Sequence, residues 1–497
     1  MARSLKESGM FDPRPNCKKN SGMFVATSQR LVWLTAPRIA RLEVTRARVV
    51  PLLTGVPPCK PVARHSHAEA GVTPAVRSRH LTRASSNLKY YMGIESSCDD
   101  TGVAIVAVDA ANAREAKILS NVVCSQADIH APFGGVVPKL AQEAHQNAID
   151  NAVDNALDEA GIQLTDLEAV GVTIGPGLSL CLRVGVTKAK DICAQYGIQM
   201  IDVHHMEAHA LVARLADDVP FPFLCLLVSG GHNLLLVVEG IGRFVQLGTT
   251  LDDALGECYD KTARALDLEA VPSGGAALEA LARDGDENAF KFPVPLKKRR
   301  TCDFSFAGLK TSVRLAIEKE QEKANKKVVA GDGGAERTGV DVPPAAIPRN
   351  IKADIAASFQ KTAAMHLDER VQRAFEWVKE SHPDVKHLVV AGGVASNQYL
   401  RTRLAKVCKE SGAHLVCPPA KLCTDNGAMV AWCAIERTRA GLPIGPDPSL
   451  QDKPEDWLDL RPRWPLTERR DERSFVGQAA RSAKKKGLHT SLELLTG

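Results

Sequence analysis

Two histidines four residues apart, His205 and His209, have the types and spacing most able to do chemistry in this chain. The apolar run over 210–215 predicts a helix, on which residues four apart lie one turn apart on the same face. Both imidazoles could then bind one metal ion. Glu207 lies about 200° around such a helix from His205 and points away, whereas the zinc-protease motif HExxH places its acid directly after the first histidine. The pattern therefore favours a metal site over protease chemistry, although two satisfied or solvated histidines would show the same spacing.

The composition is that of an ordinary globular protein. A chain of 497 residues that is 44% hydrophobic and 24% charged predicts two or more domains. The 13 cysteines are scattered without a CxxC pair, which favours a reducing compartment and argues against a disulfide framework or a structural zinc module. The longest apolar stretch, 221–238, is interrupted by polar residues at 229–233, so no membrane-spanning helix is expected.

Positive charge is concentrated near the amino-terminal end. Residues 1–90 contain 16 Lys and Arg against four acids, a balance of +12, whereas the whole chain has a net charge of +5. An Arg-rich, acid-poor segment with many small residues is typical of a mitochondrial transit segment, and it lacks the apolar core of a secretory signal. We therefore expect residues 1–88 to direct import into the mitochondrial matrix. A disordered basic arm, or residues from a mispredicted upstream exon, are the alternatives.

Two predicted hairpins carry small and polar residues at their turns. Strands over 90–95 and 103–108 flank the first turn, and strands over 223–228 and 234–238 flank the second, Ser-Gly-Gly-His-Asn. Glycine permits close backbone approach, and consecutive N–H groups can bind an anion. A buried strand over 388–391 then enters a Gly-Gly turn and a helix, which suits a nucleoside. Each element alone would be an ordinary turn. Together they favour a two-lobed α/β fold with duplicated sheets flanked by helices, as in actin, Hsp70 and sugar kinases.

We expect four segments along the chain. They are a transit or disordered segment over 1–88, an N-terminal lobe with the metal-binding helix over 89–217, a C-terminal lobe over 218–446 and an extension over 447–497. A stretch near 318–345 that is rich in Lys, Glu and Gly predicts a disordered insertion. The last 37 residues hold nine Lys and Arg against four acids, so this tail could contact RNA phosphates or simply be solvated.

Seven short motifs occur in the order of a known family. They lie at 93–102, 134–138, 175–178, 205–209, 227–232, 303–310 and 423–427. On these motifs the chain resembles the universal tRNA threonylcarbamoyladenosine synthase family, and within it the mitochondrial branch, from about Lys89 to about Leu466. Two positions depart from the family pattern. Phe133 stands where a tyrosine is usual, and 272–276 reads Pro-Ser-Gly-Gly-Ala where many relatives have Pro-Gly-Gly-Pro.

The resemblance implies a group transfer on RNA. Members of the family move a threonylcarbamoyl group from threonylcarbamoyl-AMP to N6 of adenosine 37 in tRNAs that read codons beginning with A, and they release AMP. The mitochondrial branch is expected to act as a homodimer, away from any membrane, and to receive its unstable substrate from a separate synthase. Two other readings stay open. One is a small-molecule kinase or ATPase of the same superfamily, and the other is a non-catalytic RNA-binding relative.

The resemblance also implies roles for individual residues. The metal, zinc or iron, would be held by His205, His209 and Asp425. The remaining assignments are residues expected to bind the adenylate: Leu227, Val228, Ser229, Gly230 and Gly231 around its phosphate and acyl part, Asp260 on the ribose, and Gly275 and Asn397 beside the nucleoside, with Gly274 as a rival for Gly275. Two imidazoles and a carboxylate would leave positions open for a polarised carbonyl. Glu95 and Asp99 are the candidates for a general base, although solvation or a role in shaping the phosphate-binding turn explains them equally well.

Overall fold

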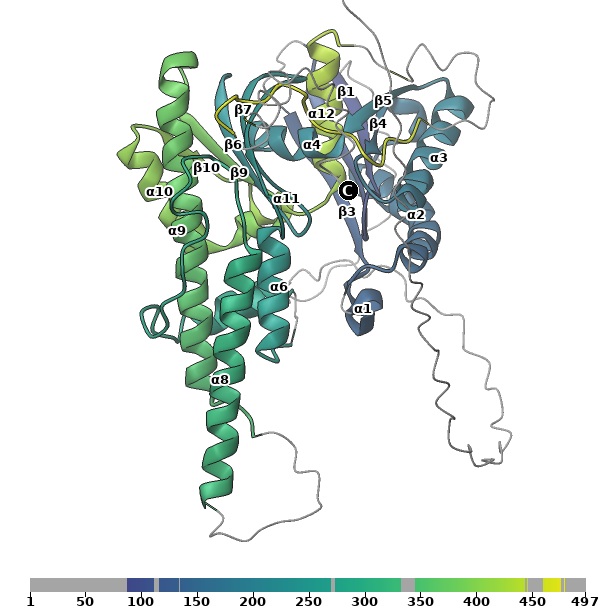
Figure 1. Cartoon of the computed structure of the whole chain (residues 1–497). Helices are drawn as coiled ribbons and strands as arrows, with labels where there is room; N and C mark the ends of the chain where they lie inside the picture. Colours follow the sequence, from purple (N-terminus) through teal and green to yellow (C-terminus); the bar gives the residue numbers. More distant parts are fainter. Residues whose placement is uncertain are drawn as a thin grey trace, which may run out of the picture. The chain divides into compact units, whose positions relative to one another are not determined.

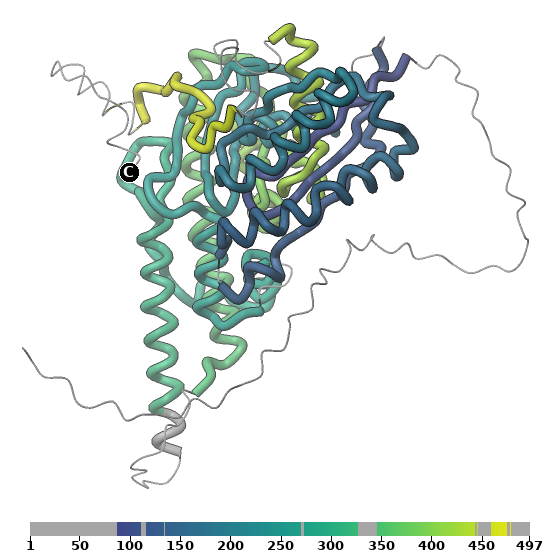
Figure 2. The backbone as a smooth tube through the Cα atoms, turned by 90° about the vertical axis from the view of Figure 1, so that its right-hand side faces the viewer, coloured from purple at the N-terminus to yellow at the C-terminus, as the bar shows by residue number. Residues whose placement is uncertain are grey.

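The computed structural model describes residues 87–110, 116–133, 135–269, 273–331, 345–442, 445, 459–474 and 478 (Figures 1 and 2). The expected transit segment therefore lies outside the described residues, except for its last two positions, and so does most of the basic tail. Within the described part, no helix is both long and apolar enough to cross a membrane.

The first sheet combines an antiparallel meander with two parallel strands. Its strands are β1 (Leu88–Glu95), β2 (Asp100–Asp109), β3 (Ala116–Ser125), β4 (Leu167–Gly175) and β5 (Gln199–His204), in the order β3-β2-β1-β4-β5. Strands β1, β2 and β3 pair antiparallel, and β4 and β5 are added in parallel. The central strands are apolar almost throughout because helices cover both faces of the sheet.

The second sheet repeats this topology strand for strand. Its strands are β6 (Phe223–Val228), β7 (Asn233–Gly240), β8 (Arg243–Thr249), β9 (His387–Ala391) and β10 (His414–Val416), in the order β10-β9-β6-β7-β8. Again three antiparallel strands are followed by two parallel ones. This repeat confirms the two-lobed α/β fold with duplicated sheets that the two hairpins predict.

Helices form layers on and between the sheets. Helices α2 (Pro138–Ala160) and α3 (Ser179–Tyr196) pack on the first sheet. The helices that accompany the second sheet are α6 (Leu255–Ala265), α7 (Gly274–Ala282), α8 (Ala307–Gly331), α9 (Arg349–Ser381) and α10 (Gln398–Glu410). Between the sheets lie α4 (His205–Leu211) and α12 (Gly427–Arg439). The short elements are α1 (Ala127–His130), η1 (Ala131–Phe133), η2 (Leu164–Asp166), α5 (Ala213–Ala216), η3 (Gly393–Ser396) and α11 (Ala420–Cys423).

Strand β6 shows how the alternation of side chains divides the core. Leu224 and Leu226 belong to the apolar cluster shared with α6–α10, whereas Cys225 and Leu227 belong to a second cluster that includes α4, α12 and residues of the first sheet. Successive side chains of a strand point to opposite faces, so one strand joins two cores. The layer that contains α4 and α12 is thus buried against both sheets.

The start of α12 touches the first sheet backbone to backbone. A Cβ atom on Gly93 of β1 would lie 2.1 Å from the carbonyl oxygen of Gly427, and a Cβ on Gly427 would lie 2.4 Å from the nitrogen of Ala104 in β2. Such distances exclude any side chain, so glycine is required by close approach. Asn426 caps the helix with its side chain. The chain just before α12 is therefore held in a fixed place against the first sheet.

Helix α8 differs from the sequence expectation. It continues to Gly331, so residues 318–331 are helical where a disordered insertion was expected from about residue 318; residues 332–344 lie outside the described residues. The reason is that the polar run consists of good helix formers whose side chains pair along the helix. Arg314 contacts Glu318 at 2.9 Å, and Lys323 contacts Glu320 at 2.7 Å.

The segment 459–474 joins the two lobes from outside the sheets. The Arg461 N–H donates to the Ile174 carbonyl of β4 at 2.8 Å. Further along, the Thr467 hydroxyl donates to the Phe244 carbonyl of β8 at 2.9 Å. The described part of the expected C-terminal extension, residues 459–474, thus contacts both sheets.

Candidate active site

The adjacent histidines 204 and 205 have different tasks. Strand β5 ends at His204, and α4 begins at His205. Nδ1 of His204 accepts the Met206 N–H at 3.1 Å, so Nε2 carries the proton and donates to the Trp464 carbonyl at 3.0 Å. Burial lowers the pKa of His204 to about 3. His204 is therefore a neutral helix cap, and only His205 is turned toward the site.

The structure brings together the three residues expected to bind a metal. Nε2 of His209 lies 3.0 Å from Oδ1 of Asp425, and Nε2 of His205 lies 3.7 Å from the same oxygen. One ligand atom from each of the three residues lies within 4.8 Å of the other two. The histidines come from the first turns of α4, and Asp425 comes from the loop between α11 and α12. The site is thus built where α4 and α12 begin, and these two helices can be followed in Figure 1.

The three side chains fit a divalent metal ion in both type and spacing. Two imidazoles and one carboxylate form a donor set that zinc and iron accept. Bonds of about 2.0–2.2 Å from such a metal place its ligand atoms roughly 3–4 Å apart, close to the spacing seen here. His205 and His209 are buried, and Asp425 is a quarter exposed. The site therefore has an accessible side beside the carboxylate.

Glu95 holds His205 from behind. Its Oε2 lies 3.2 Å from Nδ1 of His205 and accepts the Thr173 hydroxyl at 2.5 Å, while Oε1 accepts the Ser97 N–H at 2.7 Å. The carboxylate is completely buried. A proton on Nδ1 that is shared with Glu95 leaves the Nε2 lone pair of His205 facing Asp425, the arrangement seen behind many metal-binding histidines. The geometry thus gives Glu95 a positioning contact, while Asp99 is half-buried on the β1–β2 turn.

The charges of the site favour a cation between the two carboxylates. Burial alone would lower the pKa of His205, but Glu95 and Asp425 raise it to about 9. Burial alone would raise the pKa of Asp425, but His205 and His209 hold it well below its ordinary value. A proton on His205 can supply the positive charge, and a metal ion would displace that proton as it binds.

Glu207 confirms that the site is not arranged as a protease. Its two carboxylate oxygens accept the Gly242 N–H at 2.8 Å and the Arg437 guanidinium at 2.9 Å. Both partners lie away from the histidine face of α4. Glu207 is thus a buried partner of Arg437 that ties α4 to α12.

The glycine turn of the second hairpin is exposed, while the strand that leads to it is buried. Leu227 and Val228 are each 1% exposed, and their side chains belong to the core. Ser229 closes the turn through its N–H, which donates to the His232 carbonyl at 2.9 Å. A Cβ on Gly230 or Gly231 would meet no atom within 4 Å. Only the turn itself is therefore open to a ligand.

The other expected adenylate contacts lie on helices next to this turn. The Gly256 N–H of α6 donates to the Ser229 carbonyl at 3.2 Å, and Asp260 on the same helix accepts the Gly275 N–H at 3.1 Å. A Cβ on Gly274 would lie 2.8 Å from the Asp260 carboxylate, whereas a Cβ on Gly275 would have no neighbour closer than 3.8 Å. Of the two rivals, Gly274 is thus needed for packing against α6, and Gly275 faces the more open space.

Asn397 uses both ends of its amide within the protein. Its oxygen accepts the Leu400 N–H at 3.0 Å as the cap of α10, and its nitrogen donates to Gln360 at 3.0 Å. The turn before it approaches the metal site, because a Cβ on Gly393 would lie 3.8 Å from the Thr424 methyl group. Asn397 therefore fixes the third glycine turn beside the loop that carries Asp425.

Several polar residues of the site had no recognisable signal in the sequence. Ser97 and Thr173 hold Glu95 and come from separate strands or turns. His232 lies on the exposed glycine turn, and desolvation by the surrounding protein together with the charges of His205 and His209 lowers its pKa. A histidine inside a Ser-Gly-Gly-His-Asn turn was the one available hint.

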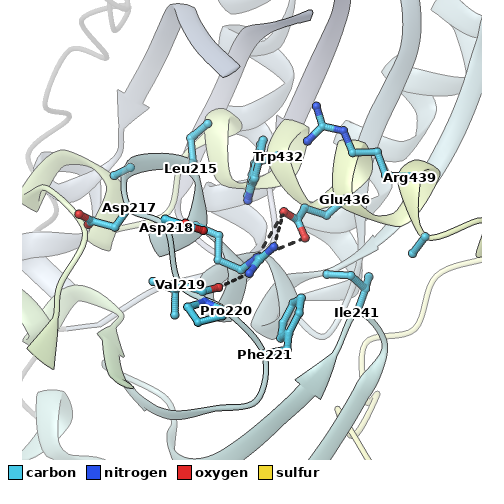
Figure 3. Close-up of a pocket in the computed structure, with 13 residues that line it drawn as sticks. Leu215, Asp217, Asp218, Val219, Pro220, Phe221, Ile241, Trp432, Glu436 and Arg439 are labelled. Atoms are coloured by element: carbon cyan, nitrogen blue, oxygen red, sulfur yellow. Dashed lines mark hydrogen bonds and ion pairs between the residues drawn. The ribbon is translucent and has the colours of Figure 1, made fainter. Parts of the chain in front are cut away.

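A cavity of about 580 Å³ lies apart from this site (Figure 3). It is lined by α5, the loop that follows it and the last turns of α12, and it contains none of the predicted site residues. The Arg214 guanidinium lies within hydrogen-bond distance of Glu436 at 3.3 Å and over the Phe221 ring at 4.1 Å. Its central charges are thus already paired within the protein.

Comparison with known proteins identifies relatives. A family model described as tRNA N6-adenosine threonylcarbamoyltransferase matches residues 117–432. The chain is 49% identical over 403 residues to a protein of Arabidopsis thaliana called probable tRNA N6-adenosine threonylcarbamoyltransferase, mitochondrial, covering 81% of this chain and 79% of that protein. It is 43% identical over 394 residues to the tRNA N6-adenosine threonylcarbamoyltransferase of Cereibacter sphaeroides, covering 79% and 98%. A solved structure of T. kodakarensis HypF matches with 15% identity over 72% of this chain and 48% of that chain, with a TM-score of 0.46. The first three matches confirm the family expected from the motifs, and the name of the Arabidopsis protein supports the expected mitochondrial localisation.

Proposed function

We propose that this chain, which belongs to the tRNA N6-adenosine threonylcarbamoyltransferase family, transfers the threonylcarbamoyl group of threonylcarbamoyl-AMP to N6 of adenosine 37 in mitochondrial tRNAs that read codons beginning with A. The observation that carries the proposal is the grouping of His205, His209 and Asp425 beside an open glycine turn. This arrangement offers a Lewis-acid site and an anion site to one substrate.

The reaction needs little chemistry from side chains. A bond forms between N6 and the carbamoyl carbon, and the bond from that carbon to the adenylate phosphate oxygen breaks. AMP leaves with the electron pair, and N6 gives up one proton to the surrounding water. Because an adenine amine is a weak nucleophile, holding the two substrates in line should contribute more than a strong base.

Each group of residues has a place in this scheme. His205, His209 and Asp425 would hold zinc or iron, which polarises a carbonyl oxygen when bound. The N–H groups of Gly230 and Gly231 would bind the adenylate phosphate, Asp260 would accept hydrogen bonds from the ribose, and Gly275 would leave room for the nucleoside. Glu95 would orient His205.

The setting of the reaction follows from the same assignment. A separate synthase would supply threonylcarbamoyl-AMP from threonine, bicarbonate and ATP. Residues 1–88 would direct the protein to the mitochondrial matrix, and the mature chain would act as a homodimer.

The proposal is tested by adding the purified chain to threonylcarbamoyl-AMP and a mitochondrial tRNA transcript. Mass spectrometry of the digested nucleosides should show threonylcarbamoyladenosine, and a transcript with guanosine in place of adenosine 37 should show none. AMP release without modified nucleoside, on a transcript that folds, would contradict the proposed transfer.

A further inference from the structure

Four consecutive cations project from the loop that joins α7 to α8. We define the basic loop as residues 295–301, Pro-Leu-Lys-Lys-Arg-Arg-Thr, of which Lys297, Lys298, Arg299 and Arg300 are exposed. Lys297, Lys298 and Arg300 form no ion pair with any residue that the structure describes. Like charges this close repel one another, so the loop would be expected to spread in solution unless something holds its backbone.

A buried arginine, Arg370, holds the backbone of the basic loop in place. The side chain of Arg370 on α9 is 0% exposed. Its guanidinium donates to four carbonyl oxygens of the basic loop: Thr301 at 2.8 Å, Arg299 and Leu296 at 2.9 Å, and Pro295 at 3.4 Å. Carbonyls along the loop are thus drawn inward onto one cation, and Leu296 takes a left-handed conformation with φ of 49°. With its backbone turned inward, the loop presents its charged side chains to solvent.

Placing Arg370 in the interior is unfavourable in itself. The nearest carboxylate, Glu369, lies 3.9 Å away and is partly exposed, and burial lowers the pKa of Arg370. A buried cation with so weak a counter-charge destabilises the fold unless hydrogen bonds replace its water. A rigid loop also loses less conformational entropy when it binds a partner. The geometry therefore suits a binding surface whose shape is set before binding.

Two further arginines lie beside the loop, and within the described part of the chain only one of them, Arg473, is paired with a carboxylate. Arg373 on α9 donates to the Thr301 carbonyl at 2.8 Å. Arg473, in the segment after β10 and α12, lies over the Trp377 ring at 4.5 Å and pairs with Asp471 at 2.6 Å. No apolar side chain stands among the four exposed cations at 297–300, whereas membrane-surface segments combine their charges with exposed apolar anchors.

We infer that the basic loop binds phosphates of the tRNA backbone. This rests on the proposed function, which requires the chain to hold a long polyanion while a single adenosine reaches the metal site. Lysine and arginine in a row contact successive phosphates without reading bases, which suits an enzyme that must accept several tRNAs. Release of counterions from those phosphates should make the affinity depend on salt.

The test compares two full-length variants that each lose three positive charges. The first is Lys297→Ala/Lys298→Ala/Arg300→Ala. The matched control is Lys117→Ala/Lys319→Ala/Lys409→Ala, which removes three exposed lysines on β3, α8 and α10 that also lack ion pairs. The Kd for a fluorescent tRNA transcript is measured at several salt concentrations, and circular dichroism checks that both variants are folded.

The basic-loop variant should bind tRNA about tenfold or more weakly at low salt, and its log–log salt slope should be smaller by about 2–3. Its KM for tRNA should rise while its KM for threonylcarbamoyl-AMP stays at the parental value. A Kd and slope equal to those of the control would overturn the inference, and so would lost binding to vesicles of anionic lipid with unchanged tRNA binding. If the parent protein itself does not modify tRNA, the proposed function fails instead, so the two failures are distinguishable.

Discussion

The two hairpin turns occupy equivalent positions in the two lobes but have opposite surroundings. In the first, between β1 and β2, a Cβ on Gly177 would lie 2.5 Å from the Ser97 carbonyl, and one on Gly185 would lie 2.4 Å from the Ser96 hydroxyl. The start of α3 thus fills that turn. In the second, Gly230 and Gly231 face open space. The turn of the first lobe is thus packed, whereas the equivalent turn of the second lobe is open.

The two equivalent turns can therefore have different roles in one site. The strand that enters the packed turn, β1, ends at Glu95, which is buried and holds His205. The open turn begins at Ser229 and continues with Gly230 and Gly231, whose N–H groups are available to an anion. The following predictions test these different roles, from the largest expected effect to the smallest.

Removal of a metal residue should have the largest effect. The His209→Ala protein should lose its bound metal and about a thousandfold or more of its transfer rate, because several kcal/mol of carbonyl activation would be lost. Metal content by mass spectrometry and rate by nucleoside analysis check this. His414→Ala, an exposed histidine on β10, is the control. Full metal content and activity in His209→Ala would contradict the assignment of His209 as a metal ligand.

Glu95→Gln should weaken metal binding by about 10- to 100-fold, the usual effect of replacing a carboxylate behind a metal-binding histidine. The amide keeps the shape of the side chain but removes its charge. The melting temperature should therefore stay near the parental value while the metal affinity falls. Competition with a metal-binding dye measures the affinity. If Glu95→Gln retained parental metal affinity and lost only catalytic rate, Glu95 would be the general base rather than a support.

The two turns should respond differently to the same substitution. Gly231→Val should weaken binding of a non-hydrolysable adenylate analogue about tenfold or more and leave the melting temperature unchanged, because its side chain would enter ligand space. Gly177→Val should instead lower the free energy of unfolding by about 1–3 kcal/mol, because its side chain would strike the Ser97 carbonyl. Calorimetry and thermal melts measure both. Similar melting temperatures for the two variants would show that the first turn is not packed as described.

Asp260→Ala should weaken binding of the same analogue by roughly 1–3 kcal/mol through lost ribose hydrogen bonds. It should leave metal content unchanged, because Asp260 lies on α6 and contacts Gly275 rather than the metal residues. Glu257→Ala, on the same helix, is the control. If Asp260→Ala and Glu257→Ala bound the analogue with equal affinity, the assignment of Asp260 to the ribose would be wrong.

Removal of residues 1–86 should have the smallest effect on catalysis. A chain that begins at Asn87 keeps both lobes and should modify tRNA at nearly the parental rate, while a reporter fused to residues 1–88 should enter mitochondria. A shortened enzyme that folds but loses tRNA affinity, with a shallower salt dependence, would show that the segment binds RNA.

The local sequence pattern was sufficient to predict the histidine face and the hairpins. It could not predict contacts between residues that are distant in the sequence. The helical period placed His205 and His209 on one face, as the structure confirms. The same period placed Glu207 away from them, which its contact with Arg437 confirms. The polar run after residue 318 resembled a disordered insertion in composition, yet its acids and bases are spaced to pair along a helix.

By itself, the sequence determined the periodic features: the paired hairpins, the histidine spacing and the glycines at the turns, because these depend on neighbours within a few residues. Only the tertiary structure decided which histidine is the cap, that Glu95 supports His205, and that Gly274 is the glycine needed for packing on α6. Asp425 reaches His209 across 216 positions of the sequence. That contact exists because Gly93 and Gly427 let α12 touch the first sheet. Close contact between two backbones produces no periodic pattern in the sequence, so it could not be predicted from the sequence.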